Sequence, residues 1–256
     1  MSTPRLPDGL LERLAGGGGV VFLTGSGISA ESGVPTFRDA LTGLWARNRP
    51  EELATPEAFR RDPDHVWGWY QARRRGVMAV DPNPGHHALR ELQSILGKTT
   101  LVTQNVDGLH QRAGSRDVLE FHGSLLRDRC SECDHRAPAG DLERDTPPPC
   151  PHCGGLMRPD VVWFGEMIPP SALEGAWQAA ASCTLFFSIG TSGLVYPAAE
   201  LAEVAGARGA ALCEINTDPT PLSARCDWVL QGRAGEVLPG LVRALSARPG
   251  PGGSRQ

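Results

Sequence analysis

The sequence predicts an α/β protein with a doubly wound, parallel, Rossmann-like sheet and a smaller second module. Short apolar runs rich in β-branched and aromatic residues recur along the chain without strict alternation, as is typical of strands covered on both faces. Helical patterns lie between several of these runs, and this order of elements is typical of parallel sheets. Two segments, residues 39–82 and 127–159, follow neither pattern and predict a smaller module made of insertions.

The elements of the large domain follow one another along most of the chain. A first helix is expected over residues 8–15, with Asp8 as its N-cap and the four glycines after it as its end. The expected strands are residues 20–24, 99–103, 117–121, 161–164, 183–189, 210–215 and 227–230. The expected helices between them are residues 86–96, 171–182, 196–209 and 234–246.

The domain boundaries follow from this order. We expect a discontinuous large domain over residues 1–38, 83–126 and 160–246. Residues 39–82 carry helical signals without a convincing strand, whereas residues 127–159 are rich in cysteine, proline and charge. Residues 247–256 have the composition of a disordered tail.

Length and composition exclude several classes of protein. The chain has 256 residues and a formal charge of −4 with acids and bases interspersed, so we expect no surface for nucleic acid or membrane lipid. No apolar run reaches the roughly 20 residues that a membrane-spanning helix needs, and the N-terminus lacks a signal-peptide pattern. We therefore expect a cytoplasmic protein, whose seven cysteines do not form a disulfide framework; a monomer is expected as well.

Four of the cysteines form two CxxC pairs, Cys130 with Cys133 and Cys150 with Cys153, with sixteen residues between the pairs. Each pair can chelate from one tight turn, and four thiolates complete a tetrahedral zinc site with bonds of about 2.3 Å. Four protein ligands leave no open position, so we expect one structural zinc ion; redox cysteines are the alternative interpretation. The remaining cysteines lie in or beside expected strands and are predicted to be core residues: Cys183, Cys213 and Cys226.

The first expected strand runs into the segment GSGISAESG (25–33). Glycine after a first strand lets the backbone approach a pyrophosphate, and the N-terminus of a following helix favours the anion. The spacing differs from the ordinary G-x-G-x-x-G, so a plain tight turn stays open as the alternative. Two further strand ends, IGTSG (189–193) and EIN (214–216), bring polar groups to the same edge of the sheet. We therefore expect one dinucleotide to lie across this edge.

Several short motifs occur together and in order. They are GSGISAESGVPTFR (25–38), TQNVDGLH (103–110), FHGS (121–124), the four cysteines, VVWFGE (161–166), GTS (190–192) and IN (215–216). In this combination the chain resembles the sirtuins, which are NAD-dependent protein-lysine deacylases, over roughly residues 10 to 245. The resemblance implies NAD as a consumed co-substrate and acylated protein lysines as substrates. It implies nicotinamide, O-acyl-ADP-ribose and free lysine as products.

The resemblance also implies roles for individual residues. His122 would be the general base that activates the ribose hydroxyls, and a histidine suits this role because its ordinary pKa is about 6.5. Three polar side chains would complete the catalytic set around nicotinamide and ribose: Gln104, Asn105 and Asp107. The implied cofactor-binding residues are Gly25, Ser26, Gly27, Ala30, Glu31, Thr36, Phe37, Arg38, Trp45, Gln104, Asn105, Val106, Asp107, Gly190, Thr191, Ser192, Asn216 and Ala234. Three other histidines are expected to be ordinary core or surface residues: His86, His87 and His110.

The acylated peptide would bind as an added strand, a mode of recognition that tolerates many sequences. The residues implied on its two sides are Val162, Phe164, Gly165 and Glu166, and Gly193, Leu194 and Val195. The chain departs from the family pattern in two places. Ser26 stands where the family usually has alanine, and its hydroxyl is small enough to fit there and can bond the pyrophosphate. The cofactor loop DALTGLW (39–45) is one residue longer than the common form, which affects closure of the loop and removes no chemical group.

One helix face places an arginine among apolar neighbours, since it reads Val66, Tyr70, Arg73 and Val77. Succinyl- and malonyl-lysine carry a carboxylate, and a half-buried carboxylate needs a hydrogen-bonded cation. Tyr70 and Arg73 match the Y-x-x-R signature of the class III sirtuins. This resemblance implies desuccinylase and demalonylase activity. Ala58 matches the small residue that widens the acyl pocket in that class.

Other interpretations stay open at this point. Arg73 can have a structural role in an ion pair with Asp62 or Asp64, and the protein would then be a plain deacetylase. Arg74 lies at the edge of the helix face and Arg75 points away from it, so both are expected to be solvated surface charges. Two further classes are a scaffold that binds NAD and zinc without turnover, and a mono-ADP-ribosyltransferase that uses the same leaving-group chemistry.

Overall fold

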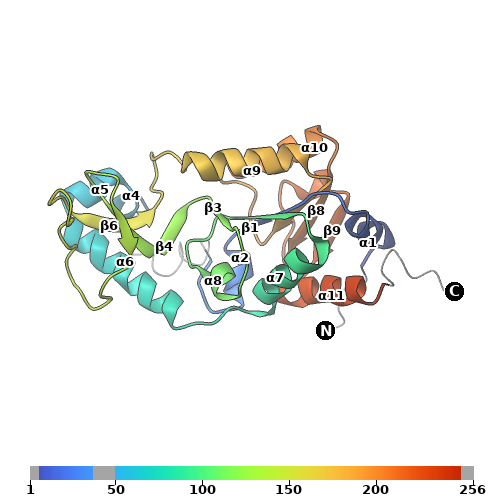
Figure 1. Cartoon of the computed structure of the whole chain (residues 1–256), viewed down its shortest axis with the longest axis horizontal. Coiled ribbons are helices and arrows are strands. Elements are labelled where there is room, and N and C mark those ends of the chain that lie inside the picture. Colours follow the sequence, from blue (N-terminus) through green and yellow to red (C-terminus); the bar gives the residue numbers. More distant parts are fainter. Residues whose placement is uncertain (1–5, 37–49, 249–256) are drawn as a thin grey trace.

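The computed structural model describes residues 6–36 and 50–248, and it confirms the predicted fold class (Figure 1). Within these residues a parallel sheet of six strands has the order β3-β2-β1-β7-β8-β9. The strands are β1 (Val20–Thr24), β2 (Thr99–Thr103), β3 (Leu119–Glu120), β7 (Leu185–Ile189), β8 (Ala211–Asn216) and β9 (Trp228–Gln231). The strand order reverses between β1 and β7, and open α/β sheets bind their ligands at the carboxyl ends of strands beside such a reversal.

Helices cover both faces of this sheet (Figure 1). One face carries α1 (Asp8–Ala15), α7 (Pro84–Leu96) and α11 (Ala234–Ser246), and the other carries α9 (Pro170–Ser182) and α10 (Glu200–Ala207). All of β1 is buried. Val20 and Phe22 pack into the core on the first face, and Val21 and Leu23 pack into the core on the second. Burial on two sides explains why the strand sequences are apolar without alternation.

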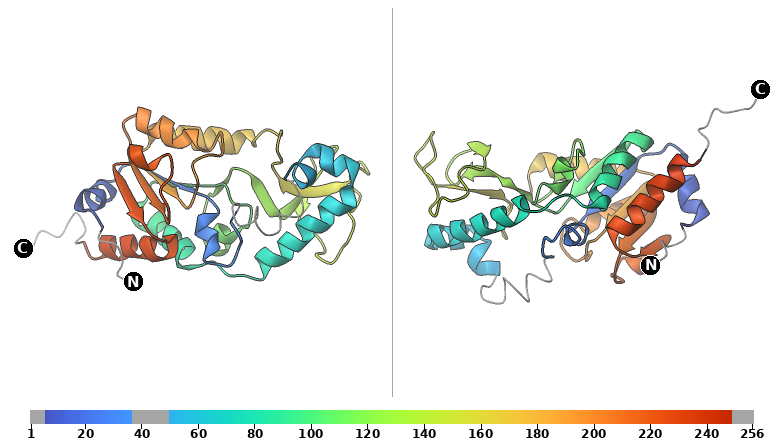
Figure 2. Two further views of the ribbon diagram at one scale, coloured as in Figure 1. Left: turned by 180° about the vertical axis from the view of Figure 1, so that it is seen from behind. Right: turned by 90° about the horizontal axis from the view of Figure 1, so that it is seen from below.

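The smaller module joins helices to a second, antiparallel sheet at one end of the molecule (Figures 1 and 2). The helices are α4 (Pro50–Leu53), α5 (Pro56–Arg61) and α6 (Pro63–Met78), and the sheet has the order β5-β4-β6 with β4 (Gly123–Cys130), β5 (Arg136–Pro138) and β6 (Met157–Val161). Thr55 and Asp62 cap α5 and α6, since each side chain accepts a hydrogen bond from the first turn of its helix. Each of these two helices then begins with a proline, which is pre-organised for the first helical position.

Arg74 of α6 is buried, so the prediction that it is a surface charge was wrong. Its side chain has an exposed fraction of 0% and forms an ion pair with Asp128 of β4. It also donates to the backbone carbonyls of Leu125 at 2.7 Å and Arg127 at 3.1 Å. The helical periodicity identified one buried face, but it contained no sign that a second sheet covers the edge of that face. Arg75 is exposed, as predicted.

Several element boundaries differ from the predictions; β3, for example, covers only Leu119–Glu120 of the expected 117–121. Pro7 occupies the N-cap position of α1, and Asp8 lies in the first turn, where its carboxylate still faces the positive end of the helix dipole. Strand β6 ends at Val161, because its pairing with β4 stops there, so residues 162–164 are not a strand. Helix α10 begins only at Glu200, after a turn. No helix in the described part of the chain is long and apolar enough to cross a membrane.

Candidate active site

The loop after β1 brings the ends of two neighbouring strands into backbone contact. The N–H of Gly25 donates to the carbonyl of Ile189 at 3.0 Å, and the N–H of Gly27 donates to the carbonyl of Gly190 at 2.8 Å. A Cβ atom on Gly25 would lie 2.7 Å from the Cβ of Thr191, and one on Gly27 would lie 2.7 Å from the Cα of Gly190. Only glycine fits at these two positions. The short helix α2 (Gly27–Ala30) begins at this contact.

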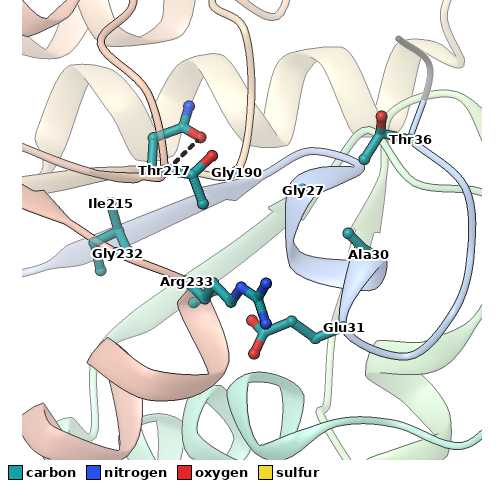
Figure 3. Close-up of a pocket in the computed structure, with 11 residues that line it drawn as sticks. Gly27, Ala30, Glu31, Thr36, Gly190, Ile215, Thr217, Gly232 and Arg233 are labelled. Carbon is teal, nitrogen blue, oxygen red and sulfur yellow. Dashed lines mark hydrogen bonds between the residues drawn. The ribbon is translucent and has the colours of Figure 1, made fainter. Parts of the chain in front are cut away.

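A pocket lies at this edge, between the ends of β7 and β8, helix α2 and the start of α11 (Figure 3). Its lining is Gly27, Ala30, Glu31, Thr36, Gly190, Ile215, Asn216, Thr217, Gly232, Arg233 and Ala234. Most of these residues were predicted to contact the cofactor, but Ile215, Thr217, Gly232 and Arg233 were not. Gly232 and Arg233 directly follow β9, and this place at a strand end is the signal that could have found them.

Hydrogen bonds between distant segments hold the walls of this pocket. Glu31 accepts a hydrogen bond from the backbone N–H of Gly235 at 2.8 Å, which ties α2 to the start of α11. Asn216 donates to the carbonyl of Thr191 at 2.9 Å, which ties β8 to the loop after β7. In Figure 3 the side chain of Arg233 extends toward Glu31. Three expected cofactor residues and the long cofactor loop lie outside the described residues: Phe37, Arg38, Trp45 and residues 39–45.

A buried polar cluster lies beside the glycine loop. Asn105 donates through its side-chain amide to the carbonyl of Gly25 at 3.1 Å and to the hydroxyl of Ser29 at 3.0 Å. The Ser29 hydroxyl in turn donates to the carboxylate of Asp107 at 2.7 Å. Burial raises the pKa of Asp107 from its ordinary value, against the hydrogen bonds that it accepts. Ser29 was not among the predicted site residues, although its place inside the glycine motif was available as a signal. Gln104 donates to the Thr191 hydroxyl at 3.0 Å, so β2 and β7 are joined as well.

His122 lies where β3 passes into β4, and its environment favours the neutral imidazole. Its Nδ1 lies 3.0 Å from the carbonyl oxygen of Gln104. That oxygen can only accept, so Nδ1 carries the proton and Nε2 keeps a lone pair. Burial lowers the pKa of His122, against the hydrogen bond to Gln104. Among the described residues, no hydrogen bond to Nε2 is present. The arrangement leaves a free basic nitrogen, as general base catalysis requires.

Two other histidines are buried against each other, and their rings lie 4.9 Å apart. His86 helps to cap α7, since its Nδ1 accepts a hydrogen bond from the N–H of Asn83. The Nε2 of His110 lies 2.9 Å from the hydroxyl of Thr24, while its Nδ1 has no partner in the described part of the chain. Burial lowers the pKa of His86 to about 4 and that of His110 to about 3, so both are neutral near pH 7. His87 is exposed.

Tyr70 and Arg73 lie next to each other on α6. Tyr70 has an exposed fraction of 1% and packs in one apolar cluster with Ala58 and Trp163. The guanidinium carbon of Arg73 lies 4.8 Å from the ring centre of Trp69 and 5.7 Å from that of Tyr70. No ion pair of Arg73 occurs within residues 6–36 and 50–248. Burial lowers the pKa of Arg73 from its ordinary value, but an arginine side chain remains a cation at neutral pH.

The alternative ion pairs expected for Arg73 are not formed in the described structure. Asp62 instead caps α6, with its carboxylate 3.1 Å from the N–H of His65. Asp64 lies in the first turn of α6 and has no ion pair among the described residues. Neither Trp69 nor Trp163 was predicted to contact the site, although Trp69 directly precedes Tyr70 and Trp163 lies within the VVWFGE motif.

The two segments expected to bind the peptide present exposed apolar side chains. Phe164, Leu194 and Val195 are exposed by 54%, 64% and 41%. Val162 donates its N–H to the carbonyl of His122 at 2.9 Å, so this segment begins beside the candidate base. The strand expected over residues 161–164 does not reach Phe164 in this structure, where Phe164, Gly165 and Glu166 form a turn closed by the N–H of Glu166 on the carbonyl of Trp163.

Glu166 is engaged within the protein. Its carboxylate accepts two hydrogen bonds from the guanidinium of Arg158, at 2.7 and 2.9 Å, and one from the backbone N–H of Trp163 at 2.8 Å. Gly165 has a φ of +86°, a backbone conformation that favours glycine and lets the turn form. The side chain of Glu166 therefore supports the segment from inside.

The four CxxC cysteines lie at the end of the smaller module, and their sulfur atoms are all within 4.8 Å of one another. The Sγ atoms of Cys130 and Cys153 are 3.5 Å apart, and those of Cys133 and Cys150 are 3.8 Å apart. A tetrahedral ion with Zn–S bonds of about 2.3 Å has sulfur–sulfur edges of roughly 3.8 Å. The four residues thus fit a structural zinc ion, with no coordination position left for a substrate. Cys183 and Cys213 are buried, and Cys226 is partly buried, as predicted for core residues.

The fold and the site define a dinucleotide-dependent enzyme with a structural zinc module. The Sir2 family model matches residues 25–197, so the chain belongs to the Sir2 family. It is 51% identical over 242 residues to NAD-dependent protein deacylase 1 of Pseudomonas aeruginosa, covering 91% of this chain and 97% of that protein. It is 47% identical over 246 residues to the NAD-dependent protein deacylase of Methylococcus capsulatus, covering 93% of this chain and 96% of that protein.

Solved structures agree with this assignment. A Sir2 homolog in complex with NAD superposes with a TM-score of 0.89 at 44% identity, and the match covers 96% of each chain. A Sir2 protein bound to a myristoylated histone peptide superposes with a TM-score of 0.74 at 36% identity, and the match covers 92% of this chain and 94% of that one.

Proposed function

We propose that this protein removes acidic acyl groups, succinyl and malonyl above all, from protein lysines. The observation that carries the proposal is Arg73, a half-buried cation that forms no ion pair in the described residues, although it interacts electrostatically with the more distant carboxylate of Asp107. An acyl carboxylate would supply the missing partner through a charge-assisted hydrogen bond. Tyr70 adds a hydroxyl beside it, and the small side chain of Ala58 in the same cluster leaves room for a longer acyl group.

The general activity follows from the family. The protein is an NAD-dependent protein deacylase, as its relatives in Pseudomonas aeruginosa and Methylococcus capsulatus are named. NAD is consumed as a co-substrate, supplying the ADP-ribose group that accepts the acyl group and losing nicotinamide. Among the residues around the pocket, we propose that Glu31 and Asn216 position the adenosine end and that Asn105 and Asp107 hold the nicotinamide end.

We assign the general base to His122. Its protonated Nδ1 is held by the carbonyl of Gln104, which fixes the ring and directs Nε2 away from β2. Nε2 accepts a proton from a ribose hydroxyl, and burial keeps the imidazole unprotonated and ready to do so at neutral pH. The peptide backbone would pair with the segments that carry Phe164 and Leu194, and this pairing requires the turn at 164–166 to become extended.

The test compares acetyl, succinyl and glutaryl forms of one peptide with the wild-type enzyme and the Arg73→Met variant. Loss of a charged contact of this kind should lower kcat/KM for the succinyl peptide by a factor of roughly 30 to 1000, with a much smaller effect on the acetyl peptide. Arg75→Met is the matched control, since Arg75 lies on the same helix and is exposed. Desuccinylation at a near wild-type rate in Arg73→Met would refute the proposal.

Plain deacetylation is the second candidate, with Arg73 held only by its two aromatic neighbours. It predicts similar rates with and without an acidic acyl group, so the same peptide panel distinguishes the two. A scaffold without turnover would release no nicotinamide with any acyl peptide, and mono-ADP-ribosyl transfer would label a protein acceptor in place of releasing the free ADP-ribosyl ester. A cytoplasmic location and a monomeric state stay predictions from the sequence.

A further inference from the structure

Trp163 joins the peptide-binding segment to Tyr70. Its indole Nε1 donates a hydrogen bond to the hydroxyl oxygen of Tyr70 at 2.9 Å, and both side chains are buried, with exposed fractions of 3% and 1%. The residues belong to different parts of the chain, since Tyr70 lies on α6 and Trp163 lies directly before the exposed Phe164. A buried contact between them therefore couples the helix to the segment that would hold the peptide.

The direction of this hydrogen bond follows from the chemistry of the two groups. An indole N–H can only donate, whereas a phenol hydroxyl can donate one proton and accept. The Tyr70 oxygen is therefore the acceptor, and its own proton remains to be donated elsewhere. Within the described residues the Tyr70 hydroxyl donates to no acceptor. A buried hydroxyl in this state has its proton available for a group that arrives with a ligand.

The indole is itself held from two sides. The guanidinium carbon of Arg158 lies 3.7 Å from the ring centre of Trp163. Arg158 is 3% exposed and forms an ion pair with Glu166 at 2.7 Å, while the same carboxylate accepts the backbone N–H of Trp163 at 2.8 Å. Phe59 packs on the indole with ring centres 5.4 Å apart. Arg158 is thus neutralised by its partner, whereas Arg73, the other cation near Tyr70, forms no ion pair in the described structure.

We propose that Trp163 is a positioning residue for acyl selectivity. By occupying the acceptor side of the Tyr70 hydroxyl, it directs the phenol proton toward the acyl carboxylate, which then receives one hydrogen bond from Tyr70 and one from Arg73. An acetyl group has no oxygen beyond its carbonyl to accept this proton, so the effect is confined to acidic acyl groups. This inference rests on the proposed preference for succinyl- and malonyl-lysine.

The experiment measures kcat/KM for succinyl and acetyl forms of one peptide, and its readout is their ratio. Trp163→Phe keeps an aromatic ring and removes the N–H donor. We expect this variant to lower the succinyl-to-acetyl ratio by about 3- to 10-fold, the effect of one misdirected neutral hydrogen bond. In a Tyr70→Phe background, which has no hydroxyl to orient, Trp163→Phe should not change the ratio further.

An isosteric variant controls for repacking in the core. Benzothienylalanine at position 163 keeps the shape of tryptophan and replaces the N–H by sulfur, so it should give the same drop even if Trp163→Phe folds poorly. A wild-type ratio in this variant, or an equal drop with and without the Tyr70 hydroxyl, would overturn the role of Trp163. If either of these two outcomes occurs while Arg73→Met still lowers the succinyl-to-acetyl ratio, the positioning role of Trp163 fails and the acidic-acyl preference stands. An unchanged ratio in Arg73→Met overturns the acidic-acyl preference and this inference with it.

Discussion

Two consecutive arginines of α6 provide a sharp test of the packing described above. Arg74 is fully buried and Arg75 is exposed, although the sequence gives both the same chemistry. We predict that Arg74→Met strongly destabilises the fold and that Arg75→Met does not. Methionine keeps much of the aliphatic stem in both variants, so the comparison isolates the guanidinium group.

The size of the effect follows from the partners that Arg74 leaves behind. Asp128 would keep a buried carboxylate without a cation, and removing one member of a buried ion pair costs about 3–5 kcal/mol. The carbonyls of Leu125 and Arg127 would also lose a donor, although this cost overlaps with the first and does not add in full. We therefore expect a loss of about 4 kcal/mol for Arg74→Met. Arg75→Met should cost less than about 1 kcal/mol, since its hydrogen bond to the Leu142 carbonyl is exposed.

Urea unfolding followed by tryptophan fluorescence measures both free energies, and the pH dependence provides a second check. Burial already raises the pKa of Asp128 in the wild-type protein, and Arg74 opposes this rise. Without Arg74 the pKa should rise further, so a proton can neutralise the carboxylate and the destabilisation should be smaller at pH 5 than at pH 8. Equal stability of the two variants at pH 8, or a cost that does not change with pH, would refute this account of Arg74.

Two further predictions concern the buried histidines and the cysteines. The pKa values of His86, about 4, and His110, about 3, lie below the ordinary 6.5. The unfolded chain therefore takes up protons first as the pH falls below 6.5, and each histidine should lower the free energy of unfolding by on the order of 2 kcal/mol at pH 5. Urea unfolding measures how much free energy of unfolding is lost between pH 7.5 and pH 5. This loss should be smaller in His110→Gln than in the wild type, and it should equal the wild-type loss in His87→Gln, whose side chain is exposed. Identical pH dependence in the wild type and both variants would contradict the assignment. For the cysteines, we expect one equivalent of zinc per chain by elemental analysis. Cys133→Ser should lower the zinc content and destabilise the smaller module, whereas Cys226→Ser should retain the metal; full zinc content in Cys133→Ser would count against the four-cysteine site.

The sequence was most informative where a local rule applies. Helix α11 and strands β1 and β2 have the predicted bounds, because runs of apolar residues with the right period set them directly. The glycines at 25 and 27 and the two CxxC pairs were predictable for a similar reason: their spacing carries the chemistry within a few residues. Gly27 and Asn216 were predicted to bind the cofactor and line the pocket. Both lie at strand ends, which the sheet brings to one edge.

What the sequence did not reveal depends on contacts between distant segments. The burial of Arg74 depends on β4, about fifty residues further along the chain, and its partner Asp128 looks like any surface acid in the sequence. The hydrogen bond from Trp163 to Tyr70 spans 93 residues. The turn at 164–166 could not be predicted either, since a short apolar run ending in glycine is compatible with a strand or a turn.

The neighbouring positions 73 and 74 divide two tasks along one turn of α6. Arg74 ties the helix to the second sheet, and Arg73 stacks on the ring of Trp69 without an ion pair in the described residues. Under the proposed function, substrate choice and structural integrity are therefore encoded one residue apart but on separate side chains. If Arg73 binds the acyl carboxylate as proposed, a change at position 73 alters which acyl group is accepted while Arg74 beside it keeps the helix in place. In such an arrangement new selectivity can evolve through single substitutions, without a loss of stability that a second mutation would have to restore.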